Sequence, residues 1–294
     1  MSKFIVVLIA GQDAVLPHDF INDMYTRSDG VGNWDWLDED RAAEFATWKP
    51  PDGMEQSRSE AHAIGCDLAV VPAENRQKRV LIADMDSTII EQESIDELAD
   101  LAGFGAHVAT ITERAMNGEI SFDEALRARV ALLRGQPVSI LTKVWRERIS
   151  ITKGAAPLLK TMAARGAKSA LISGGFTDFT ARVAKKLEFD RHYANELLVS
   201  DDQNLTGTVR EPILGPDAKF NLFRTFLSEE EVAAKDALVV GDGANDIPML
   251  KAAGMGVAFR AKPVVNAQID LQIRHADLTA LLYLQGHRLA DAVD

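Results

Sequence analysis

Two aspartates, Asp84 and Asp86, directly follow a run of four apolar residues at positions 80–83. The apolar run predicts a short, buried strand of a parallel sheet. Ligands of open α/β sheets bind just outside the carboxyl ends of the strands, so both carboxylates are expected where chemistry takes place. An ordinary turn or helix cap is the alternative, because Asp and Ser suit both. The ends of the other strands decide between the two interpretations.

Polar residues also follow two further predicted strands, at 168–172 and 237–240. The first ends at Ser173-Gly174-Gly175 and the second at the acidic stretch 241–246. Parallel strands end at the same edge of a sheet, so we expect these groups to lie near the aspartates. Converging carboxylates require a cation, and oxygen ligands without His or Cys select Mg²⁺. The Ser-Gly-Gly turn offers a hydroxyl and backbone N–H groups to an anion, and Lys219 offers a positive charge.

These parts together predict phosphoryl transfer. Asp84 would attack phosphorus and form an aspartyl phosphate, and Asp86 would protonate the leaving oxygen and then deprotonate the hydrolytic water. Each fragment alone is weak: Ser-Gly-Gly is common in turns, and Lys219 alone is more often a solvated surface residue. Their order and their common position at strand ends are much harder to obtain by chance.

The composition narrows the class of protein. The chain has 294 residues, which predicts about two domains, and its formal net charge of −12 argues against nucleic acid and anionic membranes as partners. A single cysteine, Cys66, excludes a disulfide within the chain, and its apolar neighbours favour a buried structural thiol. The start of the chain predicts a strand rather than a signal peptide, so we expect a cytoplasmic protein, for which a homodimer is compatible.

The patterns predict an α/β fold: a doubly wound parallel-sheet core, an inserted helical cap and a small N-terminal α/β domain. We expect the small domain at 1–76, the core at 77–93 and 152–294, and the cap at 94–151. The cap is a strand-free insertion of about 55 residues, far longer than a usual connection, and such insertions are usually functional. Tyr193 to Ser200 are predicted to form one strand, with residues 205–209 as its possible partner.

The sequence of the small domain predicts strands that alternate with helices. The pattern is incomplete and indicates a ferredoxin-like or ACT-like module. Positions 33–40 are predicted to be a Trp-rich acidic loop. Trp34, Trp36 and Trp48 either pack in a small core, the more common use of aromatic side chains, or line a ligand site. The sequence of this segment does not indicate its function.

The motifs resemble those of the haloacid dehalogenase (HAD) superfamily. The stretch from Asp84 to Thr88 resembles its first motif, Ser173-Gly174-Gly175 the second, Lys219 the third and residues 241–246 the fourth. Further stretches beginning at positions 93, 111, 121 and 258 resemble the phosphoserine phosphatase family within it. The resemblance covers about residues 80–285 and does not reach residues 1–76 with similar strength.

The resemblance implies Mg²⁺-dependent hydrolysis of the small molecule O-phospho-L-serine, the last step of serine biosynthesis. The implied metal ligands are Asp84, Asp86, Asp242 and Asp246, with Asp246 either a direct ligand or a residue behind one. The implied substrate-binding residues are Glu93, Met116, Phe122, Arg129, Ser173, Gly174, Lys219 and Asn245.

Four of these residues acquire roles only through the resemblance. Glu93 matches the residue that contacts the substrate ammonium, and Arg129 the residue that binds its carboxylate as a bidentate fork. Met116 and Phe122 match apolar cap residues that close over the site and exclude water. Without the resemblance, the residues indicate a helix N-terminal acid, a solvated arginine and plain helical core.

Three other functions remain open from the sequence. One is a HAD phosphatase or phosphotransferase with another substrate, such as phosphohomoserine or a sugar phosphate. The second is a signalling receiver, which also uses an aspartate, Mg²⁺ and a lysine, although the long helical insertion does not suit one. The third makes residues 1–76 an amino-acid sensor of a regulated enzyme.

Overall fold

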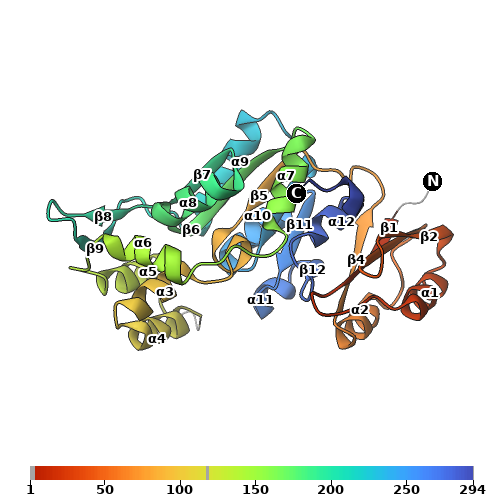
Figure 1. The fold of residues 1–294 in the computed structure, drawn as a ribbon, viewed down its shortest axis with the longest axis horizontal. Coiled ribbons are helices and arrows are strands. Elements are labelled where there is room, and N and C mark those ends of the chain that lie inside the picture. The colour runs from red at the N-terminus through yellow and green to blue at the C-terminus, as the bar shows by residue number, and fades with distance from the viewer. Residues whose placement is uncertain (1–3, 117–118, 294) are drawn as a thin grey trace. The chain divides into compact units, whose positions relative to one another are not determined.

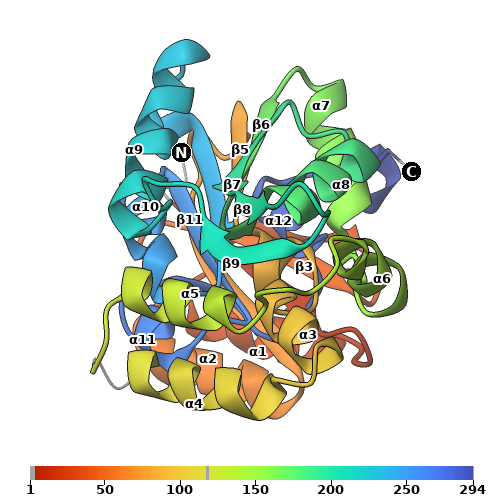
Figure 2. The same cartoon turned by 90° about the vertical axis from the view of Figure 1, so that its left-hand side faces the viewer.

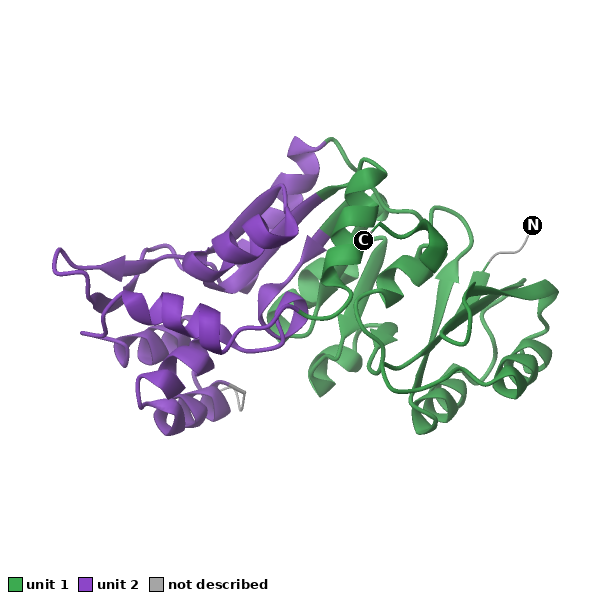
Figure 3. Ribbon diagram, viewed as in Figure 1, with its two compact units in different colours: residues 1–81, 152–168, 231–294 green, residues 82–151, 169–230 purple. Residues whose placement is uncertain are grey.

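The fold consists of two compact units, each built from separated stretches of the chain. The computed structural model describes residues 4–116 and 119–293 (Figure 1). Unit 1 comprises residues 1–81, 152–168 and 231–294, and unit 2 comprises residues 82–151 and 169–230 (Figure 3). Strand β5 (Val80–Ala83) begins in unit 1 and ends in unit 2.

The amino-terminal part of unit 1 is a four-stranded antiparallel sheet with two helices. Its elements are β1 (Phe4–Ala10), α1 (His18–Arg27), β2 (Val31–Asp38), β3 (Ala42–Thr47), α2 (Met54–Ala63) and β4 (Cys66–Pro72). The strand order is β2-β3-β1-β4, and β1 pairs antiparallel with both β3 and β4. This βαββαβ order is the ferredoxin-like arrangement, as the sequence pattern indicated.

The prediction of a Trp-rich loop at 33–40 is wrong, because most of it belongs to β2. Trp34 and Trp36 are two positions apart and therefore lie on the same face of the strand. Their rings contact each other edge to face at 5.3 Å, and the His18 ring contacts both. Both tryptophans pack against the core of this sheet, so the packing interpretation is correct for them. It is wrong for Trp48, which follows the end of β3 and is 54% exposed.

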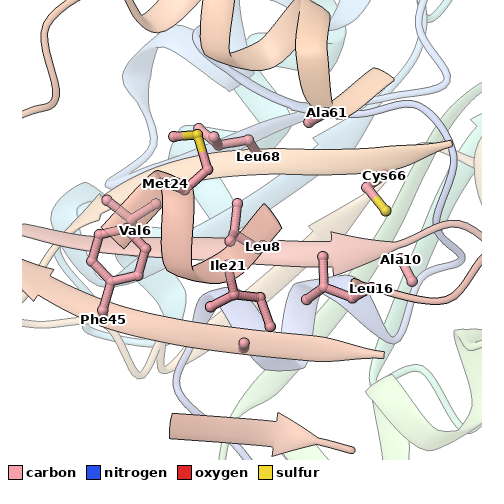
Figure 4. Close-up of a cluster of buried hydrophobic side chains, with 11 residues drawn as sticks. Val6, Leu8, Ala10, Leu16, Ile21, Met24, Phe45, Ala61, Cys66 and Leu68 are labelled. Atoms are coloured by element: carbon pink, nitrogen blue, oxygen red, sulfur yellow. The ribbon is translucent and has the colours of Figure 1, made fainter. Parts of the chain in front are cut away.

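The core of the small sheet lies between its strands and its two helices (Figure 4). Alternate residues of β1 supply one side, and α1 supplies Ile21 and Met24 on the other. Cys66 is fully buried in this cluster, and burial raises the pKa of its thiol to about 11. The prediction of a structural thiol is therefore confirmed.

The second sheet is parallel and α/β in character, as predicted. In unit 1 the order runs from β12 (Leu271–Ile273) through β11 (Met255–Phe259) and β10 (Ala237–Gly241) to β5. In unit 2, β5 is followed by β6 (Lys168–Phe176) and β7 (Arg191–Asn195). The helices of this region are α7 (Ala155–Ala164), α8 (Thr177–Leu187), α9 (Pro216–Glu229), α10 (Ile247–Ala252), α11 (Pro263–Asn266) and α12 (Ala280–Leu284).

Unit 2 also contains the predicted helical insertion. Its helices are α3 (Ser94–Leu101), α4 (Gly105–Met116), α5 (Phe122–Ala131) and α6 (Ser139–Glu147). Helix α4 packs against both α3 and α5, and β9 crosses beside α5 (Figure 2). The predicted capping box at the start of α5 is present, because Ser121 and Glu124 exchange hydrogen bonds.

The single strand predicted from Tyr193 to Ser200 is instead divided. Strand β7 ends at Asn195, and β8 (Leu197–Val199) pairs with β9 (Leu205–Val209) in a separate two-stranded sheet. Glu196 lies at the break, where Arg210 forms a two-pronged ion pair with its carboxylate. The predicted pairing with residues 205–209 is confirmed for β8. One predicted strand thus serves two sheets, which periodicity along the sequence does not reveal.

Candidate active site

Asp84 occupies the end of β5, where the buried strand meets a tight turn. The four strand residues are at most 1% exposed, and Asp84 is 5% exposed. Its Oδ1 accepts the N–H of Met85 at 2.7 Å. The Nζ of Lys219, from α9, lies 2.7 Å from the same oxygen, and both side chains are buried. This geometry holds the carboxylate of Asp84 beside a cationic side chain, which suits a nucleophile that approaches an anionic phosphoryl group.

Asp86 lies in the turn after β5 and is also buried. Its Oδ1 accepts the N–H of Ser94 at 2.6 Å, and its Oδ2 accepts the hydroxyl of Ser173 at 3.2 Å. Burial, and next the charge of Glu93, raise the pKa of Asp86 to about 7. A carboxyl group that exchanges its proton near neutral pH suits general acid–base catalysis.

The prediction that the strand ends before Ser173-Gly174-Gly175 is wrong, because β6 continues to Phe176 and its register with β7 shifts after Ile172. This irregular part of the strand is packed tightly against Asp86. Ser173 is fully buried, and its hydroxyl also accepts the N–H of Gly175 at 2.8 Å. A Cβ atom on Gly175 would lie 2.5 Å from Asp86 Oδ2 and 3.1 Å from Ser173 Oγ. The glycine is required because the backbone approaches the carboxylate too closely for any side chain.

Asn195 is a residue of this region that the sequence did not single out. Its side-chain amide donates to the carbonyl of Gly174 at 2.9 Å, and its Oδ1 accepts the N–H of Leu214 at 2.7 Å. Asn195 is 3% exposed, and these two bonds tie the Ser-Gly-Gly part of β6 to the loop that leads into α9 and Lys219. Its one sequence signal is a polar residue at the end of a strand.

Glu93 and Arg129 lie in the surroundings of Asp86. Ser87, in a left-handed conformation with φ of 55°, donates its hydroxyl to Glu93 Oε1 at 3.0 Å. Burial lowers the pKa of Arg129, and the negative charges of Asp96, Glu93 and Asp86 partly oppose that shift. The predicted carboxylate-binding guanidinium is thus half-buried and within the electrostatic reach of these acids, rather than a solvated surface group.

Of the two predicted apolar cap residues, Phe122 begins α5 and is partly buried. It lies close to Gly215, where an added Cβ would be 3.4 Å from Phe122 Cδ1. Gly215 directly precedes α9, the helix that carries Lys219. Met116 is the last residue of α4, and its side chain lies outside the described part of the structure.

Unit 1 contributes the predicted acids at the end of β10. Asp242 is 4% exposed, and Lys262 Nζ lies 3.4 Å from its Oδ2. Asp246 is fully buried and accepts the N–H of Gly243 at 3.1 Å. A Cβ on Gly241 would lie 2.6 Å from the carboxylate carbon of Asp246, so this turn too has space only for glycine. Asn245, between these acids, is partly exposed.

Comparison with known proteins identifies the family. Residues 78–254 match the model of the haloacid dehalogenase-like hydrolases. A phosphoserine phosphatase from Lactococcus lactis is 43% identical over 205 residues, which cover 70% of this chain and 94% of the relative. The chain belongs to the phosphoserine phosphatase family.

A second phosphoserine phosphatase, from Archaeoglobus fulgidus, is 41% identical over 226 residues, or 76% of this chain. The match spans 65% of that relative's length. Among solved structures, a HAD-family hydrolase from Salmonella enterica serovar Typhi covers 98% of this chain and 100% of its own, with a TM-score of 0.88 and 28% identity. That match includes the ferredoxin-like part as well as the hydrolase region.

The donor groups of this phosphatase suit a divalent cation. Asp84, Asp242 and Asp246 are all buried carboxylates, and hydrolases of this family generally use a divalent metal. Hard oxygen donors of this kind match Mg²⁺ better than a transition metal. In the described residues, none of the helices has the length and apolar character needed to cross a bilayer.

Proposed function

We infer that this phosphatase hydrolyses O-phospho-L-serine to L-serine and phosphate through an aspartyl phosphate. The observation that carries the substrate assignment is the placement of Arg129 and Glu93 around Asp86. Phosphoserine bears a carboxylate and an ammonium beside its phosphate, and a guanidinium and a carboxylate are their natural partners. A sugar phosphate offers neither charge, so these two residues favour an amino-acid phosphate.

The first chemical step is assigned to Asp84. Its carboxylate oxygen forms a bond to phosphorus, the bond between phosphorus and the serine oxygen breaks, and the electron pair leaves with that oxygen. Lys219, 2.7 Å from Asp84, helps to neutralise the charge of the phosphoryl group as it approaches the carboxylate. Ser173 and the backbone at Gly174 supply hydroxyl and N–H donors for the phosphoryl oxygens.

Asp86 moves the protons of both steps. In its neutral form it protonates the departing serine oxygen, and the resulting carboxylate then takes a proton from the water that attacks the aspartyl phosphate. The products of that second step are free phosphate and regenerated Asp84. A pKa raised to about 7 lets one carboxyl group perform both transfers near neutral pH.

We propose that Mg²⁺ is held by Asp84, Asp242 and Asp246, and Asp86 remains a further predicted ligand. The buried positions of these four carboxylates support the assignment, since an uncompensated group of negative charges is costly in a protein interior. The ion, when bound, would offset negative charge on the phosphoryl oxygens. Asn245, in the same turn as two of the ligands, is assigned to the phosphoryl group of the substrate.

Recognition of the rest of the substrate is assigned to the helical insertion. Arg129 would bind the substrate carboxylate and Glu93 its ammonium, while Phe122 and Met116 would exclude water above the phosphate. This assignment divides the chain functionally into a small domain at 1–76, a core at 77–93 and 152–294, and a cap at 94–151. A cytoplasmic location and a homodimer remain predictions; light scattering tests the second.

The test is phosphate release from phosphoserine, phosphothreonine, phosphohomoserine and glucose 6-phosphate at saturating Mg²⁺. We expect the highest kcat/KM for phosphoserine. Equal values for the sugar phosphate would remove the substrate assignment while leaving a phosphatase. Equal or higher values for phosphohomoserine would favour the main alternative, because that substrate has the same charged groups on a longer chain.

A further inference from the structure

Two histidines and an aspartate meet in unit 1, away from the residues of the phosphatase site. His62 lies in the last turn of α2, Asp67 in β4, and His275 in the segment that follows β12. Each offers one ligand atom, and these atoms all lie within 4.8 Å of one another. The two imidazole rings have centroids 5.3 Å apart.

Asp67 is fully buried and held in one orientation by three backbone N–H groups. Its Oδ1 accepts the N–H of Arg274 at 2.9 Å, and its Oδ2 accepts those of His275 and Ala276 at 3.0 and 2.9 Å. A carboxylate has about four acceptor positions, two on each oxygen. Three are occupied in this way, so one acceptor position remains, on Oδ1.

The remaining position on Oδ1 belongs to the oxygen nearest to His62. The distance from Oδ1 to His62 Nε2 is 3.8 Å, which is too long for a hydrogen bond. Two ligands of a tetrahedral Zn²⁺ ion, each about 2.1 Å from the metal, are about 3.4 Å apart. A shift of the His62 ring by a few tenths of an ångström therefore brings this pair to metal-ligand spacing, and the His62 side chain is 19% exposed.

Both imidazoles lack another role among the residues that the structure describes. Within residues 4–116 and 119–293, neither ring has a hydrogen bond. Burial, then the positive charge of Arg274, lower the pKa of His62. This shift favours the neutral imidazole, which is the form that binds metals.

We propose that His62, Asp67 and His275 form a second metal site, specific for a transition-metal ion and best matched by Zn²⁺. Two imidazole nitrogens and one carboxylate oxygen are a ligand set that Mg²⁺ disfavours and Zn²⁺ prefers. The three N–H groups on Asp67 provide the supporting hydrogen bonds that orient a ligating carboxylate. Three protein ligands leave the fourth position for water.

This ion would crosslink two segments of unit 1. Helix α2 and β4 belong to the ferredoxin-like sheet, whereas His275 follows the last strand of the parallel sheet. Bound Zn²⁺ would join these two segments, more than 200 residues apart in sequence, and stabilise the folded chain without taking part in phosphate chemistry.

The test uses the full chain, stripped of metals and then saturated with Mg²⁺, and titrates it with Zn²⁺ by calorimetry. We expect one Zn²⁺ per chain that Mg²⁺ does not displace, together with a higher melting temperature. Co²⁺ in place of Zn²⁺ should give the visible absorption of a four-coordinate site with nitrogen ligands. Removing one ligand by His62→Ala or His275→Ala should weaken Zn²⁺ binding by more than about tenfold. It should also remove the rise in melting temperature and the visible absorption of bound Co²⁺.

His107→Ala is the matched control, because His107 is exposed on α4 and outside this cluster. It should leave Zn²⁺ affinity, the thermal shift and the Co²⁺ spectrum unchanged. His62→Ala should also keep the wild-type rate of phosphate release at saturating Mg²⁺, which separates this site from the catalytic one. Zn²⁺ uptake that is equal in the wild type, His62→Ala and His275→Ala would overturn the proposal, as would no uptake by the wild type.

Discussion

Replacement of Gly175 by alanine tests the geometry of the catalytic carboxyl group with a single methyl group. The new Cβ would lie 2.5 Å from Asp86 Oδ2, whereas ordinary contact begins at 3.4 Å. The carboxylate or the turn must therefore move by 3.4 − 2.5 = 0.9 Å. A displacement of about 1 Å at a catalytic group can reduce the rate about 100-fold. We expect kcat to fall by that factor.

The methyl group is also an overpacking change, with an expected cost of about 1–3 kcal/mol of stability. The assay is phosphate release from phosphoserine at saturating substrate, with circular dichroism and thermal melting to confirm that the variant is folded. Gly105→Ala, at the start of α4, is the control, because its Cβ meets only Asp100 and it lies outside the proposed catalytic groups. A folded Gly175→Ala protein with a kcat within threefold of wild type would refute the claim that catalysis depends on the exact position of the Asp86 carboxyl group.

Three further predictions follow from the same structure. Asp84→Asn should abolish turnover and lower the melting temperature while the protein still folds, since Lys219 loses a charged partner at 2.7 Å; measurable multiple turnover would exclude Asp84 as nucleophile. Arg129→Ala should raise KM for phosphoserine at least about tenfold but spare phosphoethanolamine, which has no carboxylate; equal losses on both would contradict the contact. Cys66 should react with iodoacetamide at pH 8 about 100-fold more slowly than a free thiol, because a pKa raised from 9.0 to about 11 reduces the thiolate fraction about 100-fold. Mass spectrometry of the native protein, with the unfolded protein as reference, measures the labelling rate. Equally rapid labelling of both would disprove the prediction.

The strand ends could be predicted from the sequence because local signals agree there. Residues 80–83 are continuously apolar and are followed at once by acids, and the structure places Asp84 and Asp86 in buried positions after a buried strand. The Ser-Gly-Gly stretch was predicted to be a turn because small and polar residues often follow a strand, but it is an irregular part of β6. Its close contact with Asp86 is a tertiary fact that no local pattern contains.

Two strands were missed for different physical reasons. The Trp-rich segment contains Asn and Asp, which favour turns, yet edge-to-face contacts between Trp34 and Trp36 and pairing with β3 hold it extended. Strand β12 has only three residues, Leu271–Ile273, and its pairing with β11 supplies the order that its length cannot. In both cases the tertiary environment overrides the local preference.

The roles of Asn195 and Arg129 show where sequence reasoning without a family resemblance ends. Asn195 acts through bonds to Gly174 and Leu214, each about 20 positions away. Arg129 gains its meaning from the negative charges of Glu93 and Asp86, which reach it only after the helices of the insertion have packed. Such long-range relations become visible in the folded chain alone.

The contacts of the ferredoxin-like part also determine when it can be completed during synthesis. Asp67 binds the backbone of residues 274–276, and Arg76 donates to the carbonyls of Tyr283 and Leu284. These partners are separated by 207 to 209 residues, which a ribosome adds in roughly 10 to 40 s. The ferredoxin-like sheet is therefore synthesised well before the residues that it binds, and the carboxylate of Asp67 stays hydrated until they follow. Completion of this part of the fold consequently lags behind its own synthesis by that interval.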